Sequence, residues 1–169
     1  MIHLRLEVVD GKQIRLSGLN PLMTDCLQRL GEILPQRDSP AAQRRLFPAP
    51  SAEPQLNDEW EKFVTPDLRH LFVSAGETVL RDLTALEPDP RHPDYFHLTF
   101  PAPHRNAWLS ALNQARLILG AEFQVTEPDM DRRDLDPRQA RDLALARIHL
   151  LGYLLQLFIE FLHEDHPRL

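Results

Sequence analysis

The sequence predicts an α+β fold that is mostly helical, and three observations support this prediction. Residues 2–19 alternate apolar and polar side chains, as two β-strands do. Several later stretches repeat apolar residues every three or four positions, which places them on one face of a helix. The last of these stretches, residues 143–162, is apolar on nearly every side, so we expect it to be the central hydrophobic helix of a helical bundle.

Residues 1–19 are predicted to form a β-hairpin with one buried face. The Asp-Gly pair at 10–11 is typical of a two-residue turn, but that turn would set apolar residues opposite polar ones. A three-residue loop, residues 10–12, avoids this conflict. The register that it predicts pairs Val8 with Ile14 and Leu6 with Leu16.

A helix is predicted from Asn20-Pro21 to about Leu34. Asparagine is a favoured N-cap and proline is favoured at the first helical position, while Pro35 ends the helix. Cys26, the only cysteine of the chain, falls on the apolar face of this helix and has no histidine near it in sequence. We therefore expect a buried structural thiol rather than a nucleophile.

Residues 35–56 are predicted to be a long proline-rich loop. They contain five prolines, and no hydrophobic period holds for long. Long loops without regular structure are uncommon unless they function or move. This segment is therefore a candidate for binding a partner.

Residues 57–163 are predicted to form a helical core. Their apolar residues recur at helical spacing in four stretches: a short helix from Asn57, helices over 65–86 and 105–121, and a terminal helix launched by Asp136-Pro137. The helix over 65–86 is expected to pack against the terminal helix.

One strand interrupts this helical core. Residues 87–94 contain too many prolines for a helix, and residues 95–100 alternate apolar and polar side chains. Because so short a strand is not stable alone, we place it at the edge of the hairpin. The result is a small antiparallel sheet with helices on one face.

The composition favours one cytoplasmic domain over residues 1–169. A chain of 169 residues with 43% hydrophobic residues can bury one core. The formal net charge of −6 argues against a nucleic-acid partner, which would need a clustered positive surface. The N-terminus has no signal-peptide pattern, and polar residues interrupt the apolar run of the terminal helix, so no membrane partner is expected.

No motif in the chain predicts catalysis, so we expect no enzyme, no catalytic residue and no cofactor. Four aspartates at 129, 131, 134 and 136 lack the spacing of a calcium-binding EF-hand loop. Glu160 and His163 form only one copy of the Glu-x-x-His pair that di-iron bundles use twice. No metal site is therefore expected.

Three residues of the helix over 105–121 are the candidate binding residues: Trp108, Asn113 and Arg116. The last two are three positions apart, so both can reach one partner. An arginine in a packed helix normally needs a carboxylate, which favours a buried ion pair with Glu77 or Asp82. The alternative is a small-molecule-binding or enzymatic pocket at the same residues.

The run over residues 107–129 resembles the signature of a bacterial family, the domain of unknown function numbered twenty-seventeen. The shared pattern is Trp-Leu-x-x-Leu-Asn-x-x-Arg-Leu-x-Leu-Gly followed by Val-Thr-Glu. This chain departs from many relatives in having FVSAGETVL, residues 72–80, where they are rich in arginine. The resemblance implies no established activity, but it implies a regulatory link to Clp-type proteolysis through the adaptor that delivers N-degron substrates.

The combined interpretation is a non-catalytic protein-interaction or regulatory domain. A protein partner is therefore expected. A third possibility is a homodimeric structural protein that associates through the aromatic end of the last helix, at Tyr153, Phe158 and Phe161.

Overall fold

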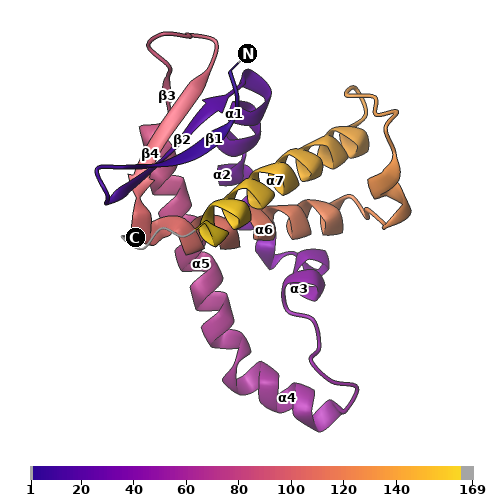
Figure 1. Cartoon of the computed structure of the whole chain (residues 1–169). Coiled ribbons are helices and arrows are strands. Elements are labelled where there is room, and N and C mark those ends of the chain that lie inside the picture. The colour runs from indigo at the N-terminus through magenta and orange to yellow at the C-terminus, as the bar shows by residue number, and fades with distance from the viewer. Residues whose placement is uncertain (1, 165–169) are drawn as a thin grey trace.

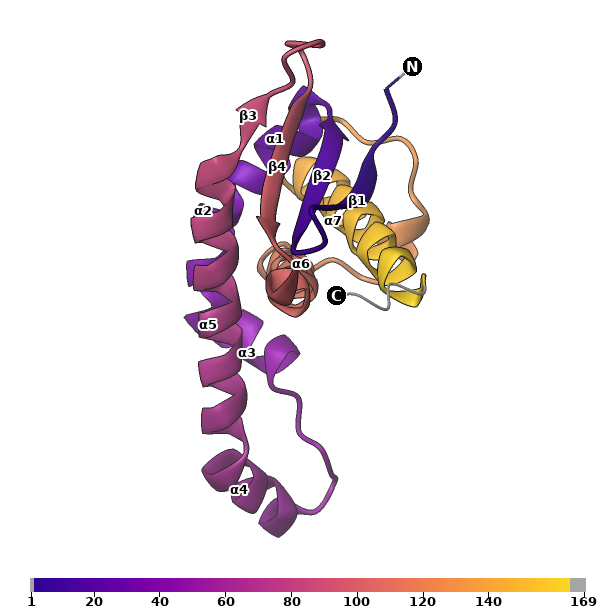
Figure 2. The same ribbon diagram turned by 60° about the vertical axis from the view of Figure 1, so that its left-hand side comes forward.

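The computed structural model describes residues 2–164, and it has a small sheet at one end and a projecting helix, α4, at the other (Figures 1 and 2). The elements follow in the order β1 (Arg5–Val9), β2 (Gln13–Leu19), α1 (Pro21–Gln28), α2 (Leu30–Ile33), η1 (Leu34–Asp38), α3 (Pro40–Leu46), α4 (Pro54–Phe63), α5 (Thr65–Asp82), η2 (Leu83–Ala85), β3 (Glu87–Pro88), β4 (Phe96–Pro101), η3 (Ala102–His104), α6 (Arg105–Glu122), η4 (Pro128–Asp131) and α7 (Ala140–His163). The α+β prediction is confirmed, with helices against one face of the sheet (Figure 2).

The N-terminal hairpin has the predicted register. Strands β1 and β2 pair Val8 with Ile14 and Leu6 with Leu16, and residues 10–12 form the loop between them. Ile14 and Leu16 are fully buried. Matching apolar residues across the two strands was therefore a better guide than the Asp-Gly pair.

The predicted third strand, β4, pairs antiparallel with β2, so that Phe100 lies opposite Ile14. A further two-residue strand, β3, pairs with β4 and gives the sheet order β1-β2-β4-β3. β3 is too short to show alternation in sequence, and it carries Pro88, which is tolerated at a sheet edge. β4 is consequently an inner strand rather than the edge that the sequence predicted.

Residues 35–56 are not the continuous loop that the sequence predicted. The 3₁₀ turn η1 and the helix α3 occupy its first half. Ser39 caps α3 by accepting a hydrogen bond from the backbone N–H of Ala42 at 3.1 Å, and Ala42 and Leu46 are buried in the core. Ser39-Pro40 is the same cap-plus-proline start as Asn20-Pro21, but α3 is too short to show a hydrophobic period.

The two helix starts predicted from a cap followed by proline differ in outcome. Asn20 caps α1, accepting a hydrogen bond from the N–H of Met23 at 2.9 Å. The α7 helix, in contrast, begins at Ala140 rather than at Asp136-Pro137. The N–H of Asp136 instead donates to the carboxylate of Asp142, so residues 136–139 form a turn before the helix.

Helix α6 lies between α5 and α7. The helix predicted over 65–86 corresponds to α5 and η2, and α5 packs on α6 rather than directly on the terminal helix. The inward residues predicted for α6 are buried: Trp108, Leu112, Ala115 and Leu119. The predicted face was therefore correct, whereas the predicted neighbour of α5 was wrong.

The terminal helix α7 is long and apolar enough, by length and composition, to cross a membrane. It has 24 residues, and one third of its most apolar window is buried. From the sequence, the apolar run was predicted to be too short to span a bilayer, because the polar residues within the helix were taken as the ends of that run. Core helices of soluble proteins share this length and composition, so these two properties do not decide between the two environments.

Candidate functional site

Two of the three predicted binding residues, Asn113 and Arg116, line one cavity of about 310 Å³. α6 supplies them, and α3, α7 and residues 125–130 supply other parts of the wall. The complete lining is Arg45, Asn113, Arg116, Leu117, Gly120, Val125, Thr126, Glu127, Met130 and Ile148.

Arg116 does not form the predicted ion pair. In the part of the chain that the structure describes, its guanidinium has no hydrogen bond or ion pair with Glu77 or Asp82, and its buried Nε has no partner. The guanidinium lies over Gly152 of α7, where a Cβ would stand 3.4 Å from Nε. α5, which carries both carboxylates, packs on another side of α6, so neither was within reach.

Trp108, the third predicted binding residue, lies in the core. Its ring is fully buried and stacks on Phe100 and Phe158, with centroid distances of 5.1 and 5.7 Å. Its Nε1 donates a hydrogen bond to Asp82 at 2.9 Å, and the same carboxylate meets His104 Nδ1 at 3.0 Å. Asp82 thus pairs with Trp108 at the start of α6 and with His104 of η3.

Arg45 is the cavity residue that sequence reasoning missed. Its Nη2 donates to the carbonyl oxygen of Val125 at 2.9 Å, and its Nη1 lies over Gly120 of α6. The basic Arg44-Arg45 pair was visible in the sequence. Its position was not, because the segment that carries it was predicted to be a loop.

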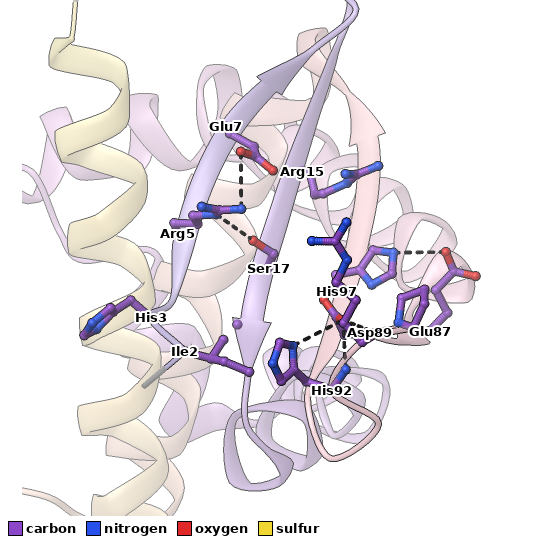
Figure 3. Close-up of a pocket in the computed structure, with 13 residues that line it drawn as sticks. Ile2, His3, Arg5, Glu7, Arg15, Ser17, Glu87, Asp89, His92 and His97 are labelled. Carbon is purple, nitrogen blue, oxygen red and sulfur yellow. Dashed lines mark hydrogen bonds and ion pairs between the residues drawn. The ribbon is translucent and has the colours of Figure 1, made fainter.

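A second candidate is a polar groove of about 510 Å³ on the outer face of the sheet (Figure 3). Arg5 lies between Glu7 and Ser17, and the His97 Nε2 atom lies 3.1 Å from Glu87 Oε1 (Figure 3). The alternation in the three predicted strands indicated that this face of the sheet is polar. It did not predict the groove, because one side of the groove is closed by the segment that carries Glu87, which lies outside those strands. Arg5 pairs with Glu7, His92 with Asp89 and His97 with Glu87. Arg15 instead donates a hydrogen bond to the hydroxyl of Thr99 at 3.3 Å.

The third candidate is the exposed apolar face of α4. None of the ten residues of this helix, all of which the structure describes, is buried. Leu56, Trp60 and Phe63 are 47, 39 and 66% exposed and line a hollow of about 470 Å³ together with Pro50. Sequence reasoning placed a short helix here but did not mark its apolar residues as a surface.

Cys26 is buried, as the sequence predicted. Burial raises the pKa of its thiol to about 11, although the nearby Arg147 guanidinium acts in the opposite direction. Within residues 2–164 there is no group of three or more His, Cys, Asp or Glu side chains able to hold a metal ion.

The predicted aromatic dimer surface is mostly internal. Phe158 and Phe161 are buried at 1 and 5% exposure, whereas Tyr153 is 55% exposed. Only Tyr153 of the three therefore faces solvent, because the two phenylalanines turn toward the core.

Comparison with known families identifies the family of this chain. Residues 16–162 match the family described as a domain of unknown function, DUF2017. The chain belongs to the DUF2017 family. The DUF2017 match runs from within β2 to the last turn of α7, so it includes the cavity and α4, whereas part of the groove lies before it, at residues 2–15. Neither the curated proteins nor the solved structures gave a match to this DUF2017 chain.

Proposed function

We propose that this DUF2017 domain is a non-catalytic protein-interaction domain whose partner docks on α4. The observation that supports the proposal is the exposed stripe of Leu56, Trp60 and Phe63. Their spacing of four and three residues puts them on one side of the helix. Exposed apolar patches mark interaction surfaces, and tryptophan is enriched among the residues that contribute most to protein binding.

The charge around this stripe indicates the chemistry of the partner. Residues 51–67 hold a single lysine, Lys62, and five carboxylates: Glu53, Asp58, Glu59, Glu61 and Asp67. A partner that buries an apolar face here therefore needs basic residues at the rim. We infer that the partner presents an amphipathic helix with an apolar face and basic flanks, which fits beside α4 in the helix-in-groove manner.

The proposal includes a regulatory role. The family resemblance implies a link to Clp-type proteolysis, so the Clp protease subunits and their N-degron adaptor are the first partners to test. A non-catalytic role agrees with the sheet groove, where Arg5 meets Glu7 and His97 meets Glu87 instead of facing an open reaction site.

The test is affinity purification of the full chain at endogenous expression, followed by mass spectrometry. Leu56→Glu places a charge in the apolar stripe. Leu22→Glu makes the same change at a leucine on α1 that is 57% exposed, against 47% for Leu56, at the other end of the molecule. The proposal expects one protein that is retained by the wild type and by Leu22→Glu but lost from Leu56→Glu.

That protein must then bind the purified domain directly, and its binding segment must be apolar with basic flanks. Identical proteins recovered by all three chains would contradict docking on α4. A partner that binds through an acidic segment would contradict the inferred chemistry even if Leu56→Glu removed it.

Self-association is the alternative, and the exposed Tyr153 favours it. Light scattering separates the two possibilities. The docking proposal expects the measured mass to be that of one chain at every concentration. A homodimer would give the mass of two chains.

A further inference from the structure

We propose that the cavity beside Arg45 and Arg116 binds a small organic anion that has one acidic group and an apolar body. This inference is independent of docking on α4. The cavity volume of about 310 Å³ falls at the small end of the range for small-molecule sites. Its walls divide into a cationic part, formed by the two arginines, and an apolar part, formed by Leu117, Met130 and Ile148.

Arg116 supplies the first argument. Its Nε is shielded from solvent and has no hydrogen-bond partner in residues 2–164. Arg116 as a whole is only partly buried, and no described residue forms a hydrogen bond or ion pair with its guanidinium, so its charge is open to an acidic group in the cavity. Gly152 leaves the guanidinium room to lie against α7.

Arg45 supplies the second argument. The carbonyl of Val125 holds one of its nitrogens, Nη2, and thereby orients the guanidinium without neutralising its charge. Nη1 lies over Gly120, which follows Arg116 on α6 by one helical turn. One turn advances about 5.4 Å along a helix, and both arginines line the same cavity. Guanidinium forks bind carboxylates and phosphates with paired hydrogen bonds.

Glu127 restricts the charge of the ligand. Among the described residues that line the cavity it is the only carboxylate, against the two arginines. A ligand with one negative charge neutralises the excess positive charge of the two arginines over Glu127. A second negative charge on the ligand would be repelled by Glu127. The amide of Asn113, on the same wall as Arg116, offers a neutral donor and acceptor for a second polar atom of the ligand.

The test is calorimetric titration of the full chain with four probes: benzoate, phenyl phosphate, inorganic phosphate and neutral benzamide. Benzoate, phenyl phosphate or both should bind. Benzamide and inorganic phosphate should each bind at least about ten-fold more weakly, because one lacks the charge and the other lacks the apolar body. Stronger binding of benzoate or of phenyl phosphate identifies the acidic group as a carboxylate or a phosphate.

Two variants and a matched control locate the binding. Arg45→Met and Arg116→Met should each weaken it about ten- to a hundred-fold, the usual effect of removing a charged hydrogen bond. Arg44→Met removes the same charge from the neighbouring position of α3, which does not line this cavity, and should leave binding unchanged. If Arg116→Met does not fold, Arg45→Met carries the test, because Arg45 lies at the surface.

Three results would overturn the inference: neither organic anion binds, benzamide or inorganic phosphate binds as well as they do, or Arg45→Met binds like the wild type. Leu56→Glu should bind the probes normally. A failure of the anion site is therefore distinguishable from a failure of docking on α4.

Discussion

At the scale of single residues, the buried carboxylate of Asp82 fixes the position of two neighbouring side chains, Trp108 and His104. Its side chain is 8% exposed and accepts hydrogen bonds from Trp108 Nε1 while contacting His104. This hydrogen bond holds Trp108 in the core, and Asp82 lies on the side of α6 away from Arg116.

Asp82→Ala should lower the free energy of unfolding by about 2–3 kcal/mol, because it leaves the buried indole N–H of Trp108 without an acceptor. Asp94→Ala, at an exposed loop position, should change it by less than about 0.5 kcal/mol. Urea unfolding followed by circular dichroism measures both values. Equal stability of the two variants would show that the contact between Asp82 and Trp108 contributes little.

Two aspartates before and at the start of α7 predict how stability depends on pH. Hydrogen bonds from Arg141 and from Thr126 hold the pKa of Asp129 well below its usual value. The backbone N–H of Asp136 and the guanidinium of Arg132 lower the pKa of Asp142. Since both pKa values are lower in the folded state, the unfolded chain binds more protons as the pH falls below about 4.

The stabilisation from these carboxylates should therefore be fully present above about pH 4 and be lost as the pH falls toward their folded-state pKa values. Urea unfolding between pH 3 and pH 7 measures the loss. Asp142→Asn should be less stable than the wild type at pH 7, and the difference should shrink toward pH 3. A constant difference across this range would contradict the assigned contacts.

At the scale of elements, how well the sequence predicted each segment depended on its length and on how many faces it buries. β1, β2 and β4 alternate because one face of the sheet is buried, and that alternation was sufficient to predict all three strands and the register of β1 with β2. α3 is a seven-residue helix in which only Ala42 and Leu46 are buried, so it shows no period and was predicted to be a loop. β3 has two residues and no pattern at all.

Gly18 and Gly11 give an element-scale prediction for the hairpin. Both have positive φ, at 78° and 66°, but a Cβ on Gly18 would overlap the carbonyl of His3, whereas a Cβ on Gly11 would meet open space. Gly11→Ala should cost about 1–2 kcal/mol for the backbone conformation alone. Gly18→Ala should cost about 1–3 kcal/mol more, because the start of β1 must move.

Urea unfolding of the two glycine variants provides the comparison, and hydrogen exchange of the β1 amides shows where the damage lies. Gly18→Ala should lose protection in β1, while Gly11→Ala should keep it. Equal losses of stability in both variants would mean that the close approach of His3 to Gly18 does not constrain the sheet.

At the scale of the whole molecule, sequence reasoning found the right cavity helix but not the complete site. Asn113 and Arg116 were recognised as polar exceptions on an apolar helix, and the structure places both in one cavity. Arg45 was out of reach of such reasoning, because no local pattern says that α3 packs on α6. The exposure of the α4 stripe also depends on tertiary structure, since a helix with an apolar face is normally covered by a neighbour.

The central claim, that α4 docks a protein partner, is tested most directly by site-specific photo-crosslinking of the full chain in a native lysate. A photoreactive phenylalanine analogue at position 60 or 63 should cross-link to one partner protein through an apolar, basic segment, and the same analogue at position 22 should not. Cross-links to no protein, or only to a second copy of this chain, would contradict the claim.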